Sequence, residues 1–252
     1  MCQRSEVSLK SMRALVCLVM LSTVDGLSYS AQSLPALNPA PWDTVLKQFV
    51  NAQHRVDYAR LKKEGSEALK EYIDGLGQAG KQTFPANQEK ALLINAYNAF
   101  TVRWILENYP TESIWRTSAP FTEARHHFRG QDVSLDQIES KLRAMADPRI
   151  HAALVCAARS CPPLRQEAYV GGRLDEQLDD NVRQWLADRS LNTFDPEHGR
   201  AEVSLIFKWY ARTLTLILAA LKGSCADIRL KMSRRLWVTG SFRSSSRITT
   251  GA

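Results

Sequence analysis

The residues best suited to chemistry lie between Ile150 and Leu164, where one histidine and two cysteines stand close together. They are His151, Cys156 and Cys161, and they are accompanied by Arg149, Arg159 and Arg165. A thiol near an imidazole and cations has the composition of a thiolate site, because positive charge lowers the pKa of a thiol. In an oxidising compartment the same two thiols would instead form a small disulfide.

The first hypothesis is a structural disulfide between Cys156 and Cys161 in a domain whose role is binding or structural. Such a bond closes a short loop, so its entropic stabilisation is only about 2 kcal/mol. An even number of thiols in the body of an exported protein favours this interpretation. The sequence leaves open whether the protein is an enzyme.

The alternative is a cysteine-dependent hydrolase or acyl-transferase. The sequence predicts a short helix from Pro162 through Ala168 with Cys161 at or next to its N-cap, where the helix dipole lowers a thiol pKa. His151 would be the general base, Glu139 would orient it, and a buried amide would stabilise the oxyanion. The candidate catalytic residues are Cys161, His151, Glu139, Asn95 and Asn98.

A third hypothesis is a metal site made of His126, His127, His151 and a cysteine. Adjacent histidines on a strand point to opposite faces, so at most one of the first two could join a common site. The spacing matches no established zinc pattern, and we expect neither a metal nor another cofactor. His54 and His198 lie in polar segments, where we expect them to be exposed to solvent.

The first 30 residues read as an export signal. Lys10 and Arg13 precede an apolar run at residues 14–21, and the small residues Ser28 and Ser30 follow. We therefore predict a signal peptide at residues 1–30 and a periplasmic or secreted protein. The apolar run is far shorter than the roughly 20 residues that cross a bilayer, so no transmembrane anchor is expected.

The net charge of +7 belongs to the end of the chain. Residues 211–252 contain eight Lys or Arg and a single acid, Asp227, so the preceding residues sum to zero. A basic excess confined to a tail says nothing about the folded body, and no nucleic-acid partner is expected. Other partners are unknown. We predict that residues 211–252 form an atypical basic tail that is either disordered or the product of a frameshift.

The remaining chain predicts a mainly helical α+β fold, a single domain at residues 42–210 with a small antiparallel sheet, after a linker at 31–41. Hydrophobic periodicity, capping residues and turn residues locate its elements. Helices are expected at 42–50, 67–76 (ended by Gly75, Gly77 and Gly80), 87–108, 174–188 and 205–210. A hairpin is expected at 126–133, a capped helix from Ser134, a strand at 150–157 and two strands at 192–194 and 202–204.

The helix at 87–108 is apolar on more than one face, which predicts that it is buried. Asn95 and Asn98 would then lie in or beside the core, where an unpaired amide costs about 1–3 kcal/mol. The simpler hypothesis is that they tie neighbouring loop backbone to the helix. The alternative is a role in binding substrate or an oxyanion.

With these segments laid out, the chain resembles the domain of unknown function 547 family, in its exported bacterial branch. The matching stretches are Val56–Tyr58, Leu93–Asn98, Leu135–Glu139 with Leu142-Arg143, Asp147–His151, Cys156–Pro162, Arg173–Leu178 and Val203–Tyr210. The resemblance spans about residues 42–210 and implies an α+β domain without an agreed activity. Two departures stand out. Ser140 replaces a family histidine, and no closing motif with a second tryptophan follows Ala211.

Overall fold

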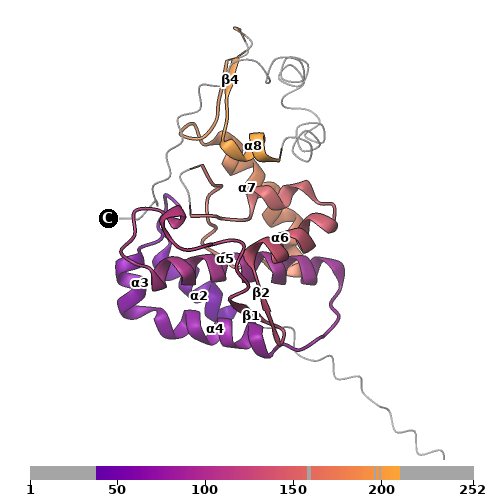
Figure 1. The fold of residues 1–252 in the computed structure, drawn as a ribbon. Helices are drawn as coiled ribbons and strands as arrows, with labels where there is room; N and C mark the ends of the chain where they lie inside the picture. The colour runs from indigo at the N-terminus through magenta and orange to yellow at the C-terminus, as the bar shows by residue number, and fades with distance from the viewer. Residues whose placement is uncertain (1–37, 158–159, 196, 199, 211–252) are drawn as a thin grey trace, which may run out of the picture. The chain divides into compact units, whose positions relative to one another are not determined.

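The computed structural model describes residues 38–157, 160–195, 197–198 and 200–210 (Figure 1). The chain divides into two units, Met1–Leu34 and Pro35–Ala252, and every described residue belongs to the second. The expected signal peptide, the basic tail and Arg159 therefore lie outside the described residues. None of the helices within the described part combines the length and apolar character that crossing a bilayer requires.

The described residues form a mainly helical α+β fold, as predicted. The α-helices are α2 (Ala40–Phe49), α3 (Tyr58–Glu64), α4 (Ser66–Gln78), α5 (Ala86–Glu107), α6 (Leu135–Ala144), α7 (Leu174–Ala187) and α8 (Leu205–Trp209). Short 3-10 helices are η1 (Ile114–Arg116), η2 (Pro148–Ala152) and η3 (Gly171–Arg173). The strands form two antiparallel pairs, β1 (His126–Phe128) with β2 (Gln131–Val133) and β3 (Thr193–Asp195) with β4 (Arg200–Glu202).

Helix α5 is the buried centre of the larger hydrophobic core. Every residue from Lys90 to Val102 is buried, which confirms the expectation from its apolar faces. Figure 1 shows α5 crossing the middle of the described ribbon, with α2, α3 and α4 on one side and α6 and α7 on the other. Groups that project from α5 can therefore reach both sets of helices.

The predicted hairpin and capped helix lie next to each other in the chain. Strands β1 and β2 pair in the register His126↔Val133, and the turn residues Arg129 and Gly130 both have positive φ, as tight hairpin turns require. The Ser134 side chain then caps α6 by accepting from the backbone N–H of Gln137, and the Gln137 side-chain oxygen accepts from the backbone N–H of Ser134. This is the predicted capping box.

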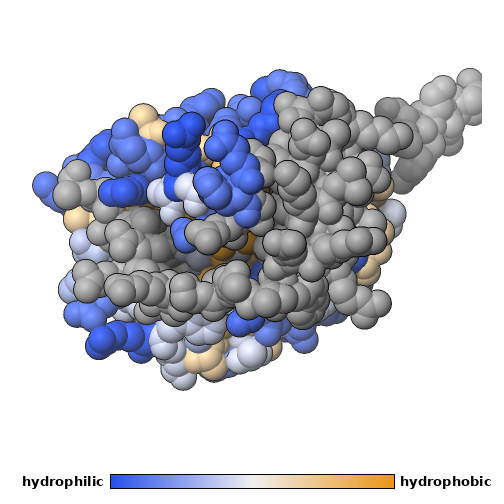
Figure 2. All heavy atoms as spheres, turned by 90° about the horizontal axis from the view of Figure 1, so that it is seen from above, coloured by the Kyte–Doolittle hydropathy of each residue, from blue (hydrophilic) through white to orange (hydrophobic). Residues whose placement is uncertain are grey.

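A second, smaller core joins α7 and α8 to the end of η2. It consists of Ala152, Val182, Trp185, Ile206 and Phe207, with the Trp185 and Phe207 rings stacked at 4.8 Å between centroids. Figure 2 shows the molecule from above, where many of the described residues are hydrophilic, the strongest hydrophobic colour lies in a small central area, and paler hydrophobic residues appear at the edges. The second core therefore holds the C-terminal elements against the segment that carries His151.

Two sequence-based predictions in the region 150–168 are wrong. Residues 150–157 do not form a strand: the helical start at Asp147-Pro148 continues as η2 through Ala152, and an irregular segment follows. Residues 162–168 do not form a helix, so Cys161 does not lie at a helix N-terminus. In both cases the backbone finds its hydrogen-bond partners in side chains from distant helices.

The predicted end of α4 is also wrong in part. Gly75 and Gly77 lie inside the helix, which continues to Gln78. A Cβ atom on Gly77 would come within 2.7 Å of His127 Cδ2, so this glycine allows the hairpin to pack closely on α4. Gly80, with a φ of 60°, follows the helix end and has the left-handed conformation typical of a helix terminator.

Candidate functional site

Asn98 of α5 fixes the backbone that follows η2. Its Nδ2 donates to the carbonyl oxygen of Ala153 at 2.9 Å, and its Oδ1 accepts from the N–H of Val155 at 2.9 Å. Both ends of the amide are thus engaged with main chain from one short segment. This arrangement confirms that Asn98 ties loop backbone to the helix.

Asn95 and Gln177 hold a second extended segment between α5 and α7. Asn95 accepts from the N–H of Tyr169 at 2.9 Å and donates to its carbonyl oxygen at 2.8 Å. From α7, Gln177 donates to the carbonyl of Ala168 and accepts from the N–H of Val170, each at 2.9 Å. The segment Ala168–Val170 is therefore bonded on both edges by side-chain amides, and the tie predicted for Asn95 is confirmed.

Sequence reasoning missed Gln177 and its neighbour Asn181. Asn181 is buried on α7 and donates to the carbonyl of Ala152 at 2.5 Å. A signal for both was present, because they fall on the apolar face of α7 with Leu178 and Val182. A polar amide at such a position needs partners inside the protein.

Cys156 and Cys161 lie between these anchored segments and form a disulfide, with Cα atoms 6.0 Å apart. The N–H of Cys156 also donates to Cys161 Sγ at 3.2 Å. Just before Cys161, the carbonyl of Ser160 accepts from the hydroxyl of Ser204 at 2.5 Å. The bond is thus embedded in a segment that is held from both sides. Since the two thiols are joined, neither is a nucleophile in this state.

His151 lies in η2, four residues before Val155, and is only 3% exposed. Its ring stacks on that of Tyr210 with 4.0 Å between centroids. Burial, with a smaller contribution from Arg143, lowers the pKa of His151 to about 4, so the imidazole is neutral near pH 7. Its Nε2 is buried and has no hydrogen-bond partner within the described part of the chain.

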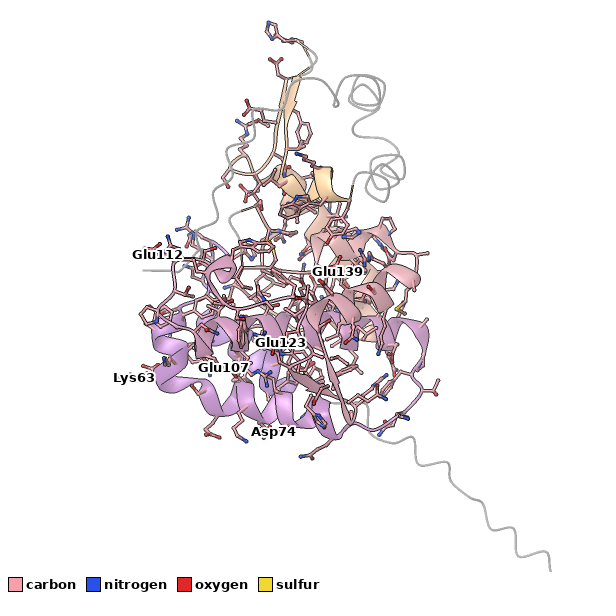
Figure 3. All side chains as sticks on the ribbon, viewed as in Figure 1. Lys63, Asp74, Glu107, Glu112, Glu123 and Glu139 are labelled. Carbon is pink, nitrogen blue, oxygen red and sulfur yellow. A yellow bond between two sulfur atoms is a disulfide. The ribbon has the colours of Figure 1, made fainter. Side chains whose placement is uncertain are left out.

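Glu139 comes from α6, where Figure 3 labels it, and it is 8% exposed. Burial raises the pKa of its carboxyl group, and a hydrogen bond from the Tyr210 hydroxyl opposes that shift. Burial and Glu139 together raise the pKa of Tyr210. Glu139 Oε1 is a second buried atom without a hydrogen-bond partner among the described residues, and the guanidinium of Arg143 lies 3.8 Å from it.

These contacts define the Glu139–Tyr210–His151 cluster. Glu139 bonds to the Tyr210 hydroxyl and His151 stacks on the Tyr210 ring, so Tyr210 connects the two residues that the sequence singled out. Tyr210 was not predicted as a site residue. The available signal was its place at the end of the Val203–Tyr210 stretch that resembles the family.

Ser140 stands beside the cluster, where the family resemblance predicts a histidine. Its hydroxyl accepts from Arg143 Nη2 at 2.9 Å. It also lines a shallow hollow that runs from α6 to the hairpin. The hollow is lined by Gln131, Asp132, Val133, Asp136, Gln137, Ser140 and Lys141. The departure at position 140 therefore lies at a surface depression next to Glu139.

The other described histidines contact residues outside the Glu139–Tyr210–His151 cluster. His126 is buried against Phe100 and accepts from Arg103 Nη2 at 2.9 Å, while burial and nearby arginines lower its pKa to about 3. His127 is exposed, which confirms that the adjacent histidines face opposite ways. His198 is exposed as expected, whereas the prediction for His54 is wrong: it is half-buried and donates to the Leu164 carbonyl at 2.9 Å.

The third hypothesis required several metal-ligating side chains at one place. Within the described ranges, no group of three or more His, Cys, Asp or Glu side chains is placed to hold a metal ion. The groups that the structure brings together are instead a carboxyl group, a phenol and an imidazole. Such a set can accept and donate hydrogen bonds and exchange protons.

Comparison with known proteins identifies the central part of the chain. Residues 81–186 match the model of the family described as "Protein of unknown function, DUF547". This segment includes α5, α6, the two cysteines and most of α7. No curated protein and no solved structure matches the chain. The match supports the assignment of this chain to the DUF547 family, as its sequence motifs predicted.

Proposed function

We propose that the protein is an exported binding domain in which the Cys156–Cys161 disulfide fixes a loop against the helical body. The observation that carries this proposal is the disulfide itself, which follows backbone anchored by Asn98 and Asn181 and precedes the segment anchored by Asn95 and Gln177. Disulfides persist mainly outside the reducing cytosol, and the leader-like residues 1–30 agree with such a location. A loop held in this way loses little conformational entropy when it contacts a ligand.

The redox test uses the exported full-length protein, alkylated with iodoacetamide without reductant and then mapped by peptide mass spectrometry. We expect one linked peptide and no label on Cys156 or Cys161. Cys156→Ser and Cys161→Ser should each lower the free energy of unfolding by about 2 kcal/mol, because either change opens the same loop. Reductant should have the same effect on the wild type. Free labelling of both thiols would contradict the proposal.

The export test compares the full chain with a form lacking residues 1–30 by cell fractionation. We expect the full chain outside the cytoplasm and the shortened form inside it, because an export signal acts through its apolar segment. A matched control replaces Lys62, an exposed residue of α3, and should leave localisation unchanged. Equal cytoplasmic retention of both forms would contradict export.

A cysteine-dependent hydrolase is the second candidate. It is favoured by the Cys156 N–H, which would stabilise a thiolate on Cys161 after reduction, whereas the lowered pKa of His151, near 4, makes this imidazole a weak general base. This candidate predicts fast labelling of Cys161 alone in the reduced protein at mildly acidic pH. Cys161→Ser should then abolish labelling by an acyl probe without loss of folding. Equal and slow labelling of both thiols would exclude an activated nucleophile.

A further inference from the structure

Two buried polar atoms of the Glu139–Tyr210–His151 cluster have no hydrogen-bond partner among the described residues. They are Glu139 Oε1 and His151 Nε2, in residues that are 8% and 3% exposed. An unsatisfied polar atom in a protein interior costs about 1–3 kcal/mol. Two such atoms on residues joined by a third indicate a place where a ligand supplies the missing bonds.

The cluster needs a hydrogen-bond donor. Glu139 already accepts from Tyr210, and its Oε1 forms an ion pair with Arg143 at 3.8 Å, a distance too long for a hydrogen bond. The rings of His151 and Tyr210 are stacked nearby, and Tyr97 of α5 is close enough that Glu139 raises its pKa. A buried carboxylate beside aromatic rings is a setting that attracts organic cations.

The charges around the cluster also favour a cation. Asp136, one turn before Glu139 on α6, lines the neighbouring hollow and raises the pKa of Glu139. The hollow contains a second acid, Asp132, and one base, Lys141. Arg143 is a second base, and 46% of its side chain is exposed. The three acids of this region, including Glu139, still outnumber the two bases. Solvent screens Arg143 more than it screens the buried carboxyl group.

We infer that the Glu139–Tyr210–His151 cluster binds the ammonium group of a small primary amine, with its N–H donors directed to Glu139 Oε1 and His151 Nε2 and its carbon chain toward the aromatic rings. This inference rests on the binding role proposed above and gives that role a ligand class. It uses contacts that do not involve the disulfide.

The test titrates the full-length, disulfide-bonded protein with n-butylammonium by isothermal calorimetry. We expect Glu139→Gln to weaken binding by at least about tenfold, because it removes the negative partner of a buried charge pair. The matched control is Glu112→Gln, whose side chain is 74% exposed and which Figure 3 shows well apart from Glu139. It should bind like the wild type, and butyrate should not bind to either protein.

A second measurement needs only the wild type and therefore does not depend on how the variants fold. An ammonium ion prefers the ionised carboxylate, so affinity should rise with pH through the raised pKa of Glu139, with protons released on binding. His151 stays neutral over that range above its pKa of about 4. Affinity that is independent of pH, or equal in Glu139→Gln, would overturn the inference.

The outcomes separate this inference from the proposed disulfide role. Butylammonium binding by a protein whose cysteines label freely would overturn the role of the disulfide and leave the ammonium site standing. Absence of binding to the disulfide-bonded protein would overturn the ammonium site alone.

Discussion

The buried histidines His126 and His151 make the stability of the fold depend on pH. Their pKa values in the folded protein are about 3 and about 4, below the ordinary value of 6.5. The unfolded chain therefore binds protons more strongly, and stability that is complete above about pH 6.5 is lost as the pH falls. Between about pH 7 and about pH 5, each histidine should lower the free energy of unfolding by about 2 kcal/mol, as measured by urea denaturation.

The control for this prediction is His127→Gln, which changes the exposed histidine of the same strand and should leave the pH dependence unchanged. His151→Gln should remove about half of it, whatever its effect on stability near neutral pH. The raised pKa of Glu139 acts in the opposite direction and partly offsets the loss. A pH dependence that survives removal of both buried histidines would show that other groups cause it.

Asn98→Ala tests the backbone tie. The change leaves the Ala153 carbonyl and the Val155 N–H without their partner, so we expect the free energy of unfolding to fall by about 3 kcal/mol. Asn87→Ala on the same helix removes one long, exposed bond to Asp175 and should cost about 0.5 kcal/mol or less. Chemical denaturation measures the free energy of unfolding of both variants. If Asn98→Ala and Asn87→Ala lower it equally, the bonds from Asn98 to the loop backbone add no stability.

Among the secondary-structure elements, η2 depends on one aspartate. Asp147 accepts from the Arg149 backbone, which caps η2, and pairs with Lys90 at 2.7 Å in a buried setting. Asp147→Asn should lower the free energy of unfolding by about 3 kcal/mol, because it leaves a buried ammonium without its counter-charge. Asp179→Asn, which removes an exposed partner of Arg149, should cost far less. If Asp147→Asn and Asp179→Asn lowered the free energy of unfolding equally, the buried ion pair would not be the more stabilising one.

The elements that sequence could predict are those whose signals are local. The capping box at Ser134, the hairpin at 126–133 and the two-faced helix α5 depend on residues within a few positions of each other. Residues 150–170 could not be predicted because their backbone partners come from α5, 55 to 74 positions earlier, and from α7, 7 to 29 positions later. The apolar residues of this segment suggest a strand or a helix. The hydrophobic pattern carries no information about side chains elsewhere in the chain that bond to the segment's backbone.

The candidate site, like the fold, could be predicted only in part from the sequence. Chemistry-bearing residue types pointed to Glu139 and His151, and the structure connects them through Tyr210. The direct contact expected between Glu139 and His151 is replaced by this indirect one. Sequence spacing could not show it, because Tyr210 lies beyond the second hairpin and reaches the cluster only through the packing of α8.

At the scale of the whole fold, the elements around the larger core are more deeply buried than those around the smaller core. α5 is enclosed by several helices, whereas the β3–β4 pair has three residues per strand and lies beside the smaller core. We expect amides at residues 94–102 to exchange hydrogen only on global unfolding, and those of β3 to exchange through local opening. Hydrogen-exchange mass spectrometry measures both, and equally slow exchange would show that the cores unfold together.

The amides that tie residues 153–170 have one more consequence. Asn98 and Gln177 each bond a carbonyl and the N–H two residues later, which is how a neighbouring strand addresses one edge of a β-strand. These side chains thus take the place of a neighbouring strand inside the fold. Removing one would leave N–H and C=O groups of that buried edge unpaired, so that self-association through this edge becomes easier in molecules where the segment opens.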